Sequence, residues 1–306
     1  MEFQHKNMSL HSTNDTHCSS PLSGKFKRLA STFGAELDFN QLDGNERQHL
    51  LDNIADYLPE HKVFVIRNAD LSRSEIHQLG HSMGKPLKYA FSNGVEGFPE
   101  LIEIRRTPTQ VTALSTMWHS DSTYLPAPPD VTVLYGVEIP PFGGTTLFAD
   151  TAAAFDDLSP TMRDLLRKLR VVQRSDVHAN NERLAHLSKP ATSEVALSAV
   201  HSAIKESDGV EAIYVSQEHS AYFEGMSREE SKPLLDFLLR HIVADKYRLE
   251  ITWQPNTLVV SDNRKTQHRA IDNYYGHSRT LLRLIVQLGK REAATVESDS
   301  LLALAA

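Results

Sequence analysis

Two short segments near opposite ends of the chain carry the residue types of one iron site. The first contains His119 and Asp121, and the second, far downstream, contains His268. Two imidazoles and one carboxylate form the facial triad, which leaves three metal positions open for a cosubstrate and oxygen. On an extended segment residues i and i+2 point to the same side, so His119 and Asp121 can reach one metal. The chain has fifteen histidines, so the His119 and Asp121 pair alone is weak evidence for a metal site. The surrounding sequence determines how strong the prediction is.

Two arginines follow the distant histidine at spacings that suit anion binding. Arg279 comes eleven residues after His268, and a planar guanidinium can hold a carboxylate through two parallel charge-assisted hydrogen bonds. Arg283 lies four residues further on, and on a strand i and i+4 face the same way. An arginine on the inward face of an apolar strand is costly unless it meets an anion, which suggests an anionic substrate. The alternative for Arg283 is a salt bridge to a neighbouring acid.

The elements that must position these residues are mostly short strands. Helices are predicted over 72–83 and 227–243, where Ser72 with Glu75 and Ser227 with Glu230 form capping boxes, and after Ser159. The 171–207 segment has weak periodicity, and we expect it to cover the active site. Many strands with few helices predict a mainly β fold with flanking helices, either a sandwich or an open barrel. The predicted strands cover 63–66, 101–104, 131–137, 145–148, 249–253, 257–260 and 280–288.

Composition narrows the class of protein. The 306 residues carry a net charge of −7 and no basic cluster, which argues against nucleic acid as a partner. The only cysteine is Cys18, so no internal disulfide can form and we expect a reducing, cytoplasmic location. No apolar run is long enough to span a membrane, and residues 1–23 lack the apolar centre of a signal peptide. We expect a flexible N-terminal tail over 1–23, a single domain over 24–290 and a C-terminal tail over 291–306.

Several sequence blocks, taken in order, resemble the taurine / 2,4-dichlorophenoxyacetate dioxygenase family from about Gly34 to Leu288. These blocks are Trp118–Tyr124, Pro128–Pro129, Gly143–Phe148, Trp253–Asn256, Asp262–Arg264 and Thr266–Ala270. The resemblance implies a double-stranded β-helix (jelly-roll) core and an Fe(II)- and 2-oxoglutarate-dependent dioxygenase. It matches His119, Asp121 and His268 to the metal triad. It also matches Thr146 and Arg279 to the residues that bind the C5 carboxylate of 2-oxoglutarate.

The resemblance further implies the reaction and part of the substrate pocket. With O2, such an enzyme hydroxylates a substrate C–H bond and releases succinate and carbon dioxide, and the product can then lose a neighbouring group. Arg283 matches a residue that contacts the acidic group of the substrate. Tyr89 and Ser115 fall near the family's substrate contacts but differ in residue type, which makes taurine doubtful. Phe91 and Tyr222 are further candidates for the pocket wall.

Two other interpretations stay open at this point. The same His119, Asp121 and His268 could hold zinc in a hydrolase, although no hydrolase motif accompanies them. A binding relative without catalysis is the second. We expect a small-molecule substrate and a homo-oligomer. The block at His201–Lys205 departs from the family pattern, which puts its lid or subunit contacts in doubt.

Overall fold

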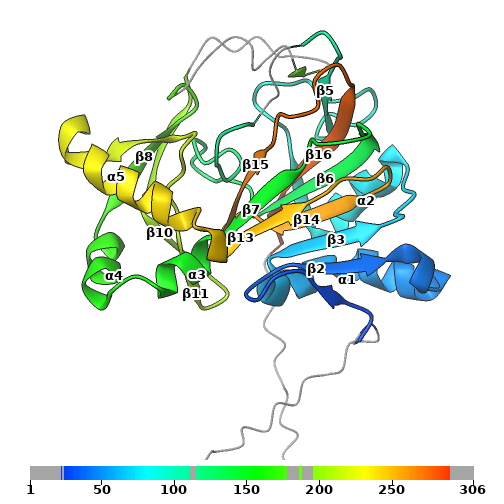
Figure 1. Cartoon of the computed structure of the whole chain (residues 1–306), viewed down its shortest axis with the longest axis horizontal. Coiled ribbons are helices and arrows are strands. Elements are labelled where there is room, and N and C mark those ends of the chain that lie inside the picture. The colour runs from blue at the N-terminus through cyan, green and yellow to red at the C-terminus, as the bar shows by residue number, and fades with distance from the viewer. Residues whose placement is uncertain (1–21, 23, 111–114, 178–185, 188–195, 290–306) are drawn as a thin grey trace, which may run out of the picture.

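A computed structural model describes residue 22 and residues 24–110, 115–177, 186–187 and 196–289 (Figure 1). Its largest element is an eight-stranded sheet in which β2 and β3 pair in parallel and the other pairs are antiparallel. In order across the sheet the strands are β1 (Lys27–Arg28), β2 (Ala35–Asp38), β3 (Val63–Arg67), β14 (Leu258–Asp262), β6 (Val131–Glu138), β16 (Arg279–Leu288) and β4 (Gly84–Leu87), with β5 (Ile102–Arg106) also paired to β16.

A second, three-stranded sheet packs against one face of the large sheet. Its strands in order are β13 (Arg248–Ile251), β7 (Thr146–Asp150) and β15 (Thr266–Ala270). Alternate residues on each strand meet in one buried cluster between the sheets: Val63 and Val65 from β3, Leu134 from β6 and Leu281 from β16 pack with Phe148 from β7. Since side chains alternate across a strand, this parity also fixes which polar residues point inward.

The opposite face of the large sheet is covered by two helices, α1 (Gly44–His61) and α2 (Arg73–Met83) (Figure 1). Both begin with a capping box, from Asp43 and Glu46 in α1 and from Ser72 and Glu75 in α2. The intervening strand residues, such as Phe64, pack under these helices. The large sheet is therefore apolar on both faces, which explains its nearly continuous apolar runs.

A smaller group of elements covers the outer face of the three-stranded sheet, on the left of Figure 1. Ala149, which points away from Phe148, packs into this group's core. The group contains α3 (Thr151–Asp156), α4 (Pro160–Arg167), α5 (Arg228–Ile242), β8 (Arg170–Arg174), β9 (Ser198–Ser202), β10 (Ile204–Ser207), β11 (Val210–Ile213) and β12 (Ser220–Phe223). Two short 3-10 helices, η1 (Phe39–Gln41) and η3 (Asp245–Tyr247), complete the described elements.

The mainly β fold with flanking helices is confirmed, and so are the three predicted helices, with Ser72, Ser159 and Ser227 at their N-caps. Strands β8, β9 and β10 occupy parts of the 171–207 segment, for which the sequence allowed no assignment. The predicted tails lie outside the described residues, except that Leu22 is fully buried against the α1 side of the core. Within the described ranges, no helix is long and apolar enough to cross a bilayer.

Candidate metal and cosubstrate site

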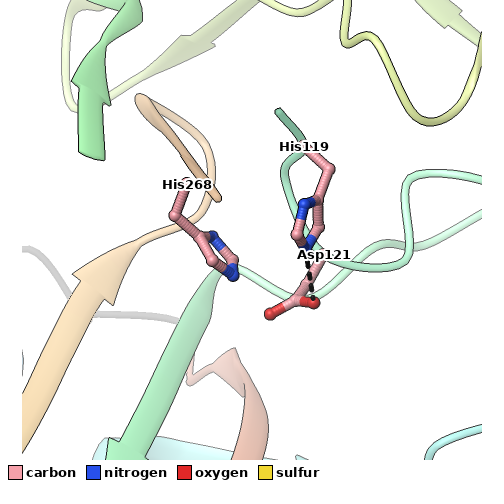
Figure 2. A group of neighbouring side chains, drawn as sticks. All are labelled: His119, Asp121 and His268. Atoms are coloured by element: carbon pink, nitrogen blue, oxygen red, sulfur yellow. Dashed lines mark ion pairs between the residues drawn. The ribbon is translucent and has the colours of Figure 1, made fainter. Parts of the chain in front are cut away.

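The structure brings the three predicted metal ligands together between the two sheets. One ligand atom from each of His119, Asp121 and His268 lies within 4.8 Å of the other two. All three side chains are buried and point toward one another (Figure 2). The Nε2 atom of His119 lies 3.7 Å from Oδ1 of Asp121. Two imidazole nitrogens and one carboxylate on one side of a shared space suit a ferrous ion that keeps further positions open.

A short backbone pairing joins the two distant segments. The amide of His119 donates to the carbonyl of His268 at 3.1 Å, and the amide of His268 donates back at 2.8 Å. His268 lies opposite Phe148 in the register of β15 with β7, and its ring stacks on Phe148 at 5.6 Å. His268 therefore faces the interior between the sheets, and the loop that carries His119 and Asp121 is held against it.

Asn263 holds the backbone on the other side of this loop. Its Oδ1 accepts from the amide of Asp121 at 2.6 Å, and its Nδ2 donates to the carbonyls of Asp121 and Pro129 at 3.0 and 2.9 Å. Asp121, Pro129 and Asn263 are all buried, so each of these polar groups requires a partner. Asn263 thus fixes the backbone from which the carboxylate ligand projects.

Replacing Asn263 with alanine should lower the free energy of unfolding by about 1–3 kcal/mol for each buried group left without a partner. The loop around Asp121 should loosen at the same time and weaken metal binding. Thermal and denaturant unfolding would measure the loss, with the exposed Asn40→Ala as the control substitution. Equal unfolding midpoints for the two variants would contradict the role given to Asn263.

The electrostatic setting keeps both kinds of ligand in their metal-binding forms. Burial alone would raise the pKa of Asp121, but Arg283, His268 and His119 outweigh it and hold that pKa well below its usual range. Burial, followed by the neighbouring His119, lowers the pKa of His268 to about 3. At neutral pH the carboxylate is therefore ionised and the His268 imidazole is neutral, as metal coordination requires.

Two hydrogen bonds orient the carboxylate of Asp121. Thr132 donates from Oγ1 to Oδ2 at 2.6 Å, and Arg283 donates from Nη1 to Oδ1 at 2.8 Å. Thr132 and Arg283 both point inward, like Leu134 and Leu281 on the same strands. The salt bridge weighed as an alternative for Arg283 is thus present, and its partner is the predicted metal ligand itself.

A cavity extends from His268 toward Arg279. Its wall contains two arginines of the same strand face, which agrees with the four-residue spacing seen in the sequence. The residues that line it are Ile104, Ser115, Leu134, Thr146, His268, Ala270, Arg279, Leu281 and Arg283. A molecule in this space would touch one metal ligand and both guanidinium groups.

Arg279 is a buried cation in the wall of this cavity. It is 6% exposed, and the described residues give it no acidic partner within salt-bridge distance. Its Nη2 lies 3.5 Å from Oγ1 of Thr146, and its Nε makes no hydrogen bond to the described residues. Burial lowers the pKa of Arg279, and Tyr274 opposes this shift only in part, which means that the described residues compensate the buried charge incompletely. A carboxylate entering the cavity would supply that compensation.

Thr146 is held ready to donate. Its Oγ1 accepts a hydrogen bond from Nε1 of Trp253 at 2.9 Å as well as the longer contact from Arg279. An oxygen that accepts from two nitrogen donors can direct its own hydrogen elsewhere. The pair of Thr146 and Arg279 therefore offers several donors to one carboxylate. In the sequence Trp253 is only part of a motif, because its contact with Thr146 depends on how β13 lies beside β7.

The remaining predicted pocket residues divide into two groups. Ser115 lines the cavity, and Tyr89 lies under Arg283, whose guanidinium carbon is 4.3 Å from the ring centroid. Phe91 contacts Tyr89 at a centroid distance of 5.5 Å, so it extends the same aromatic wall. Tyr222 does not line this cavity in the described structure: it lies on β12 opposite Val172, and Arg228 packs over its ring.

Proteins of similar sequence include named alpha-ketoglutarate-dependent dioxygenases. The chain is 32% identical over 263 residues to an alpha-ketoglutarate-dependent sulfonate dioxygenase of Saccharomyces cerevisiae. The aligned region covers 81% of this chain and 62% of the yeast protein. It is also 26% identical to an alpha-ketoglutarate-dependent sulfate ester dioxygenase of Pseudomonas putida, in an alignment that covers 84% of this chain and 87% of the Pseudomonas protein. Alpha-ketoglutarate is another name for 2-oxoglutarate.

Structural and family comparisons agree with these relatives. The crystal structure of a taurine dioxygenase from Burkholderia xenovorans superimposes with a TM-score of 0.69 at 26% identity, over 86% of this chain and 90% of that chain. The family model for taurine catabolism dioxygenase TauD, TfdA family, matches residues 25–285. With the His119, Asp121 and His268 triad assembled, the chain belongs to the TauD/TfdA family and is an Fe(II)- and alpha-ketoglutarate-dependent dioxygenase with a jelly-roll core.

Proposed function

We propose that this dioxygenase oxidises a small anionic substrate, a sulfonate or a sulfate ester, at the carbon next to the acidic group. Iron bound by His119, Asp121 and His268 would supply the oxidising chemistry, in which O2 and 2-oxoglutarate give succinate, carbon dioxide and one oxygen atom for the substrate C–H bond. A carbon that carries both a hydroxyl and a sulfonate or sulfate breaks down to an aldehyde and sulfite or sulfate. The names of the yeast and Pseudomonas relatives support this substrate class.

The cosubstrate position follows from the buried cation beside the triad. Arg279 and Thr146 would hold the distal carboxylate of 2-oxoglutarate, because both line the cavity that begins at His268. This would aim the other end of the molecule, with its keto acid group, at the metal. The apolar side chains of Leu134 and Leu281 in the same wall would exclude water and strengthen the ion pair. The buried Arg279 without an acidic partner in the described structure is the observation that carries the assignment.

The substrate anion is assigned to Arg283. One edge of its guanidinium is occupied by Asp121, but its Nε and Nη2 atoms are buried and make no hydrogen bond within the described structure. Those two N–H groups could donate to an anion while Nη1 still orients the metal ligand. The ring of Tyr89 under the guanidinium and the neighbouring Phe91 would pack on the carbon chain of the substrate.

Replacing Arg283 with leucine should reduce kcat/KM for an anionic substrate by at least about thirtyfold, because a buried charge pair lost by truncation costs roughly 2–5 kcal/mol. Affinity for 2-oxoglutarate should change much less, and some decarboxylation without substrate oxidation should persist. Succinate release would be compared for an alkyl sulfate and an uncharged ether of the same length. Arg283→Lys is the matched variant, since it keeps the charge but not the planar donor geometry.

The proposed role of Arg283 would be wrong if the leucine variant lost activity equally toward the charged and the uncharged substrate. That outcome would leave Arg283 as an orienting partner of Asp121 alone. Iron affinity has to be measured in the same variants, because Nη1 contacts the proposed metal ligand. The comparison then separates a weaker metal site, which affects every substrate, from a lost anion site, which affects only the charged one.

We also propose, from the sequence, that residues 24–290 form a single domain and that the enzyme works as a homo-oligomer in the cytoplasm. The family match over residues 25–285 supports the domain limits. Light scattering of the purified protein should give a multiple of the 34.3 kDa chain mass. A mass of one chain at all working concentrations would remove the oligomer from this proposal.

A further inference from the structure

A buried acidic residue lies on the outer side of the proposed metal ligand His119. Glu218 is 6% exposed and sits in the turn that joins β11 to β12. Its Oε2 is 3.1 Å from Nδ1 of His119, while the other ring nitrogen, Nε2, faces Asp121. The imidazole of His119 therefore lies between the carboxylate of Glu218 and the proposed metal position. A carboxylate is costly to bury, so its position against this ring indicates that it interacts with the imidazole.

The turn that carries Glu218 is fastened to the strand of one metal ligand and the loop of another. Gln267, next to His268 on β15, donates to the carbonyl of Val215 at 2.5 Å. The amide of Glu218 donates to the carbonyl of Trp118, the residue before His119, at 3.2 Å. These contacts connect the turn that carries Glu218 to the residues next to both histidine ligands.

Two serines make the turn compact. The amide of Ser216 donates to Oγ of Ser220 at 2.9 Å, and the amide of Ser220 donates to the carbonyl of Ser216 at 3.1 Å. The amide of His219 also donates to Oγ of Ser216 at 3.3 Å. All of these side chains are buried, so the carboxylate of Glu218 is placed by a fixed backbone.

The surroundings of His119 determine which of its nitrogens carries hydrogen. Nδ1 lies 2.8 Å from the carbonyl oxygen of Met117 and 3.1 Å from the carboxylate of Glu218. Neither group can donate when the carboxylate is ionised, so Nδ1 must be the donor. The lone pair is then on Nε2, which is the atom that faces Asp121. A negative charge on the far side of a ligating imidazole also raises its basicity.

We propose that Glu218 is a positioning residue of the metal centre, whose negative charge favours the His119 tautomer with hydrogen on Nδ1 and makes its Nε2 a stronger donor to iron. This inference rests on the proposed role of His119 as a metal ligand. Met117 supplies a neutral acceptor to the same nitrogen, so the specific contribution of Glu218 is its charge. Glutamine at this position keeps the size of the side chain and leaves the hydrogen bond between Nδ1 and Met117 in place, which allows the charge to be removed alone.

The test is Glu218→Gln, titrated anaerobically with Fe2+ in the presence and absence of 2-oxoglutarate. Iron affinity should fall about 10- to 100-fold, the range seen when partners of metal-bound histidines are replaced. The visible charge-transfer band from iron to bound 2-oxoglutarate should move to higher energy, because the metal becomes less electron-rich. Glu224→Gln is the control, since Glu224 follows β12 on the same segment but is half exposed and pairs with Arg170.

Two further variants keep the inference testable if the glutamine variant folds poorly. Glu218→Asp keeps the charge but retracts it, and should give an intermediate affinity and band position. In a His119→Asn background, which has no imidazole to act through, Glu218→Gln should change iron affinity by less than about threefold. Wild-type iron affinity and band energy in folded Glu218→Gln would overturn the proposal. If the wild-type protein itself bound no Fe2+, the metal assignment would fail instead, so the two failures are distinguishable.

Discussion

Replacing His268 with alanine should abolish succinate formation, with a fall in kcat of at least about a thousandfold, or roughly 4 kcal/mol of lost barrier reduction. His268 would supply one of only three bonds from protein to metal, and its ring already lies within 4.8 Å of the other two ligands. Iron content after dialysis and succinate release under saturating 2-oxoglutarate would measure the effect. The fold should survive, because the buried cluster between the sheets is contributed by other residues.

Two comparisons make that result specific. His119→Ala and Asp121→Ala should behave like His268→Ala, whereas His81→Ala, an exposed histidine at the end of α2, should retain full activity. Circular dichroism and thermal unfolding would exclude loss of structure as the cause. A triad variant that kept stoichiometric iron and wild-type turnover would show that a different ligand set holds the metal.

Arg279→Ala should weaken 2-oxoglutarate binding by about thirtyfold to several thousandfold, from the roughly 2–5 kcal/mol that truncation of a buried charge partner costs. The effect should be large because Arg279 is buried, and among the described residues that line the cavity only Arg283 could offer the distal carboxylate of 2-oxoglutarate another guanidinium. Thr146→Val should have a smaller effect, about 1.5–3 kcal/mol for a hydrogen bond to a charged group. Anaerobic titration of the ferrous enzyme with 2-oxoglutarate would measure both.

The matched control for that experiment is Arg105→Ala. Arg105 lies on β5 opposite Thr280, one residue from Arg279, but it is exposed. Its loss should leave 2-oxoglutarate binding unchanged. If Arg279→Ala bound 2-oxoglutarate as tightly as Arg105→Ala did, the cosubstrate carboxylate would have to lie elsewhere, and Arg283 would be the next residue to test.

Local sequence signals predicted the helix starts well, because a capping box depends only on residues three apart. Ser72 with Glu75 and Ser227 with Glu230 form the predicted pairs. The longest helix, α1, was nevertheless missed. It begins with the same kind of box, from Asp43 and Glu46, but its apolar stripe is diluted by many polar residues and it contains Pro59 near its end. Its N-cap is an aspartate, whereas the two capping boxes predicted from the sequence begin with serine.

The sequence predicts which residue types form the site, but it does not predict which of their side chains contact one another. The ligand types and the shared face of Arg279 and Arg283 follow from spacing along single strands. The contact between Arg283 and Asp121 depends on the register that sets Arg283 opposite Leu134, two residues from Thr132. The place of Glu218 beside His119 likewise depends on how a turn folds against a distant loop. Such contacts arise from tertiary packing, for which one sequence carries no local signal.

The most direct test of the enzyme's activity and substrate class is the stoichiometry of turnover with a series of alkanesulfonates and alkyl sulfates. Wild-type protein with Fe2+, 2-oxoglutarate and O2 should release succinate and sulfite or sulfate in a ratio of one to one. Omission of either Fe2+ or 2-oxoglutarate, or replacement of His268, should stop both products. Sulfite or sulfate released without succinate, or at an undiminished rate in the His268→Ala variant, would contradict the mechanism.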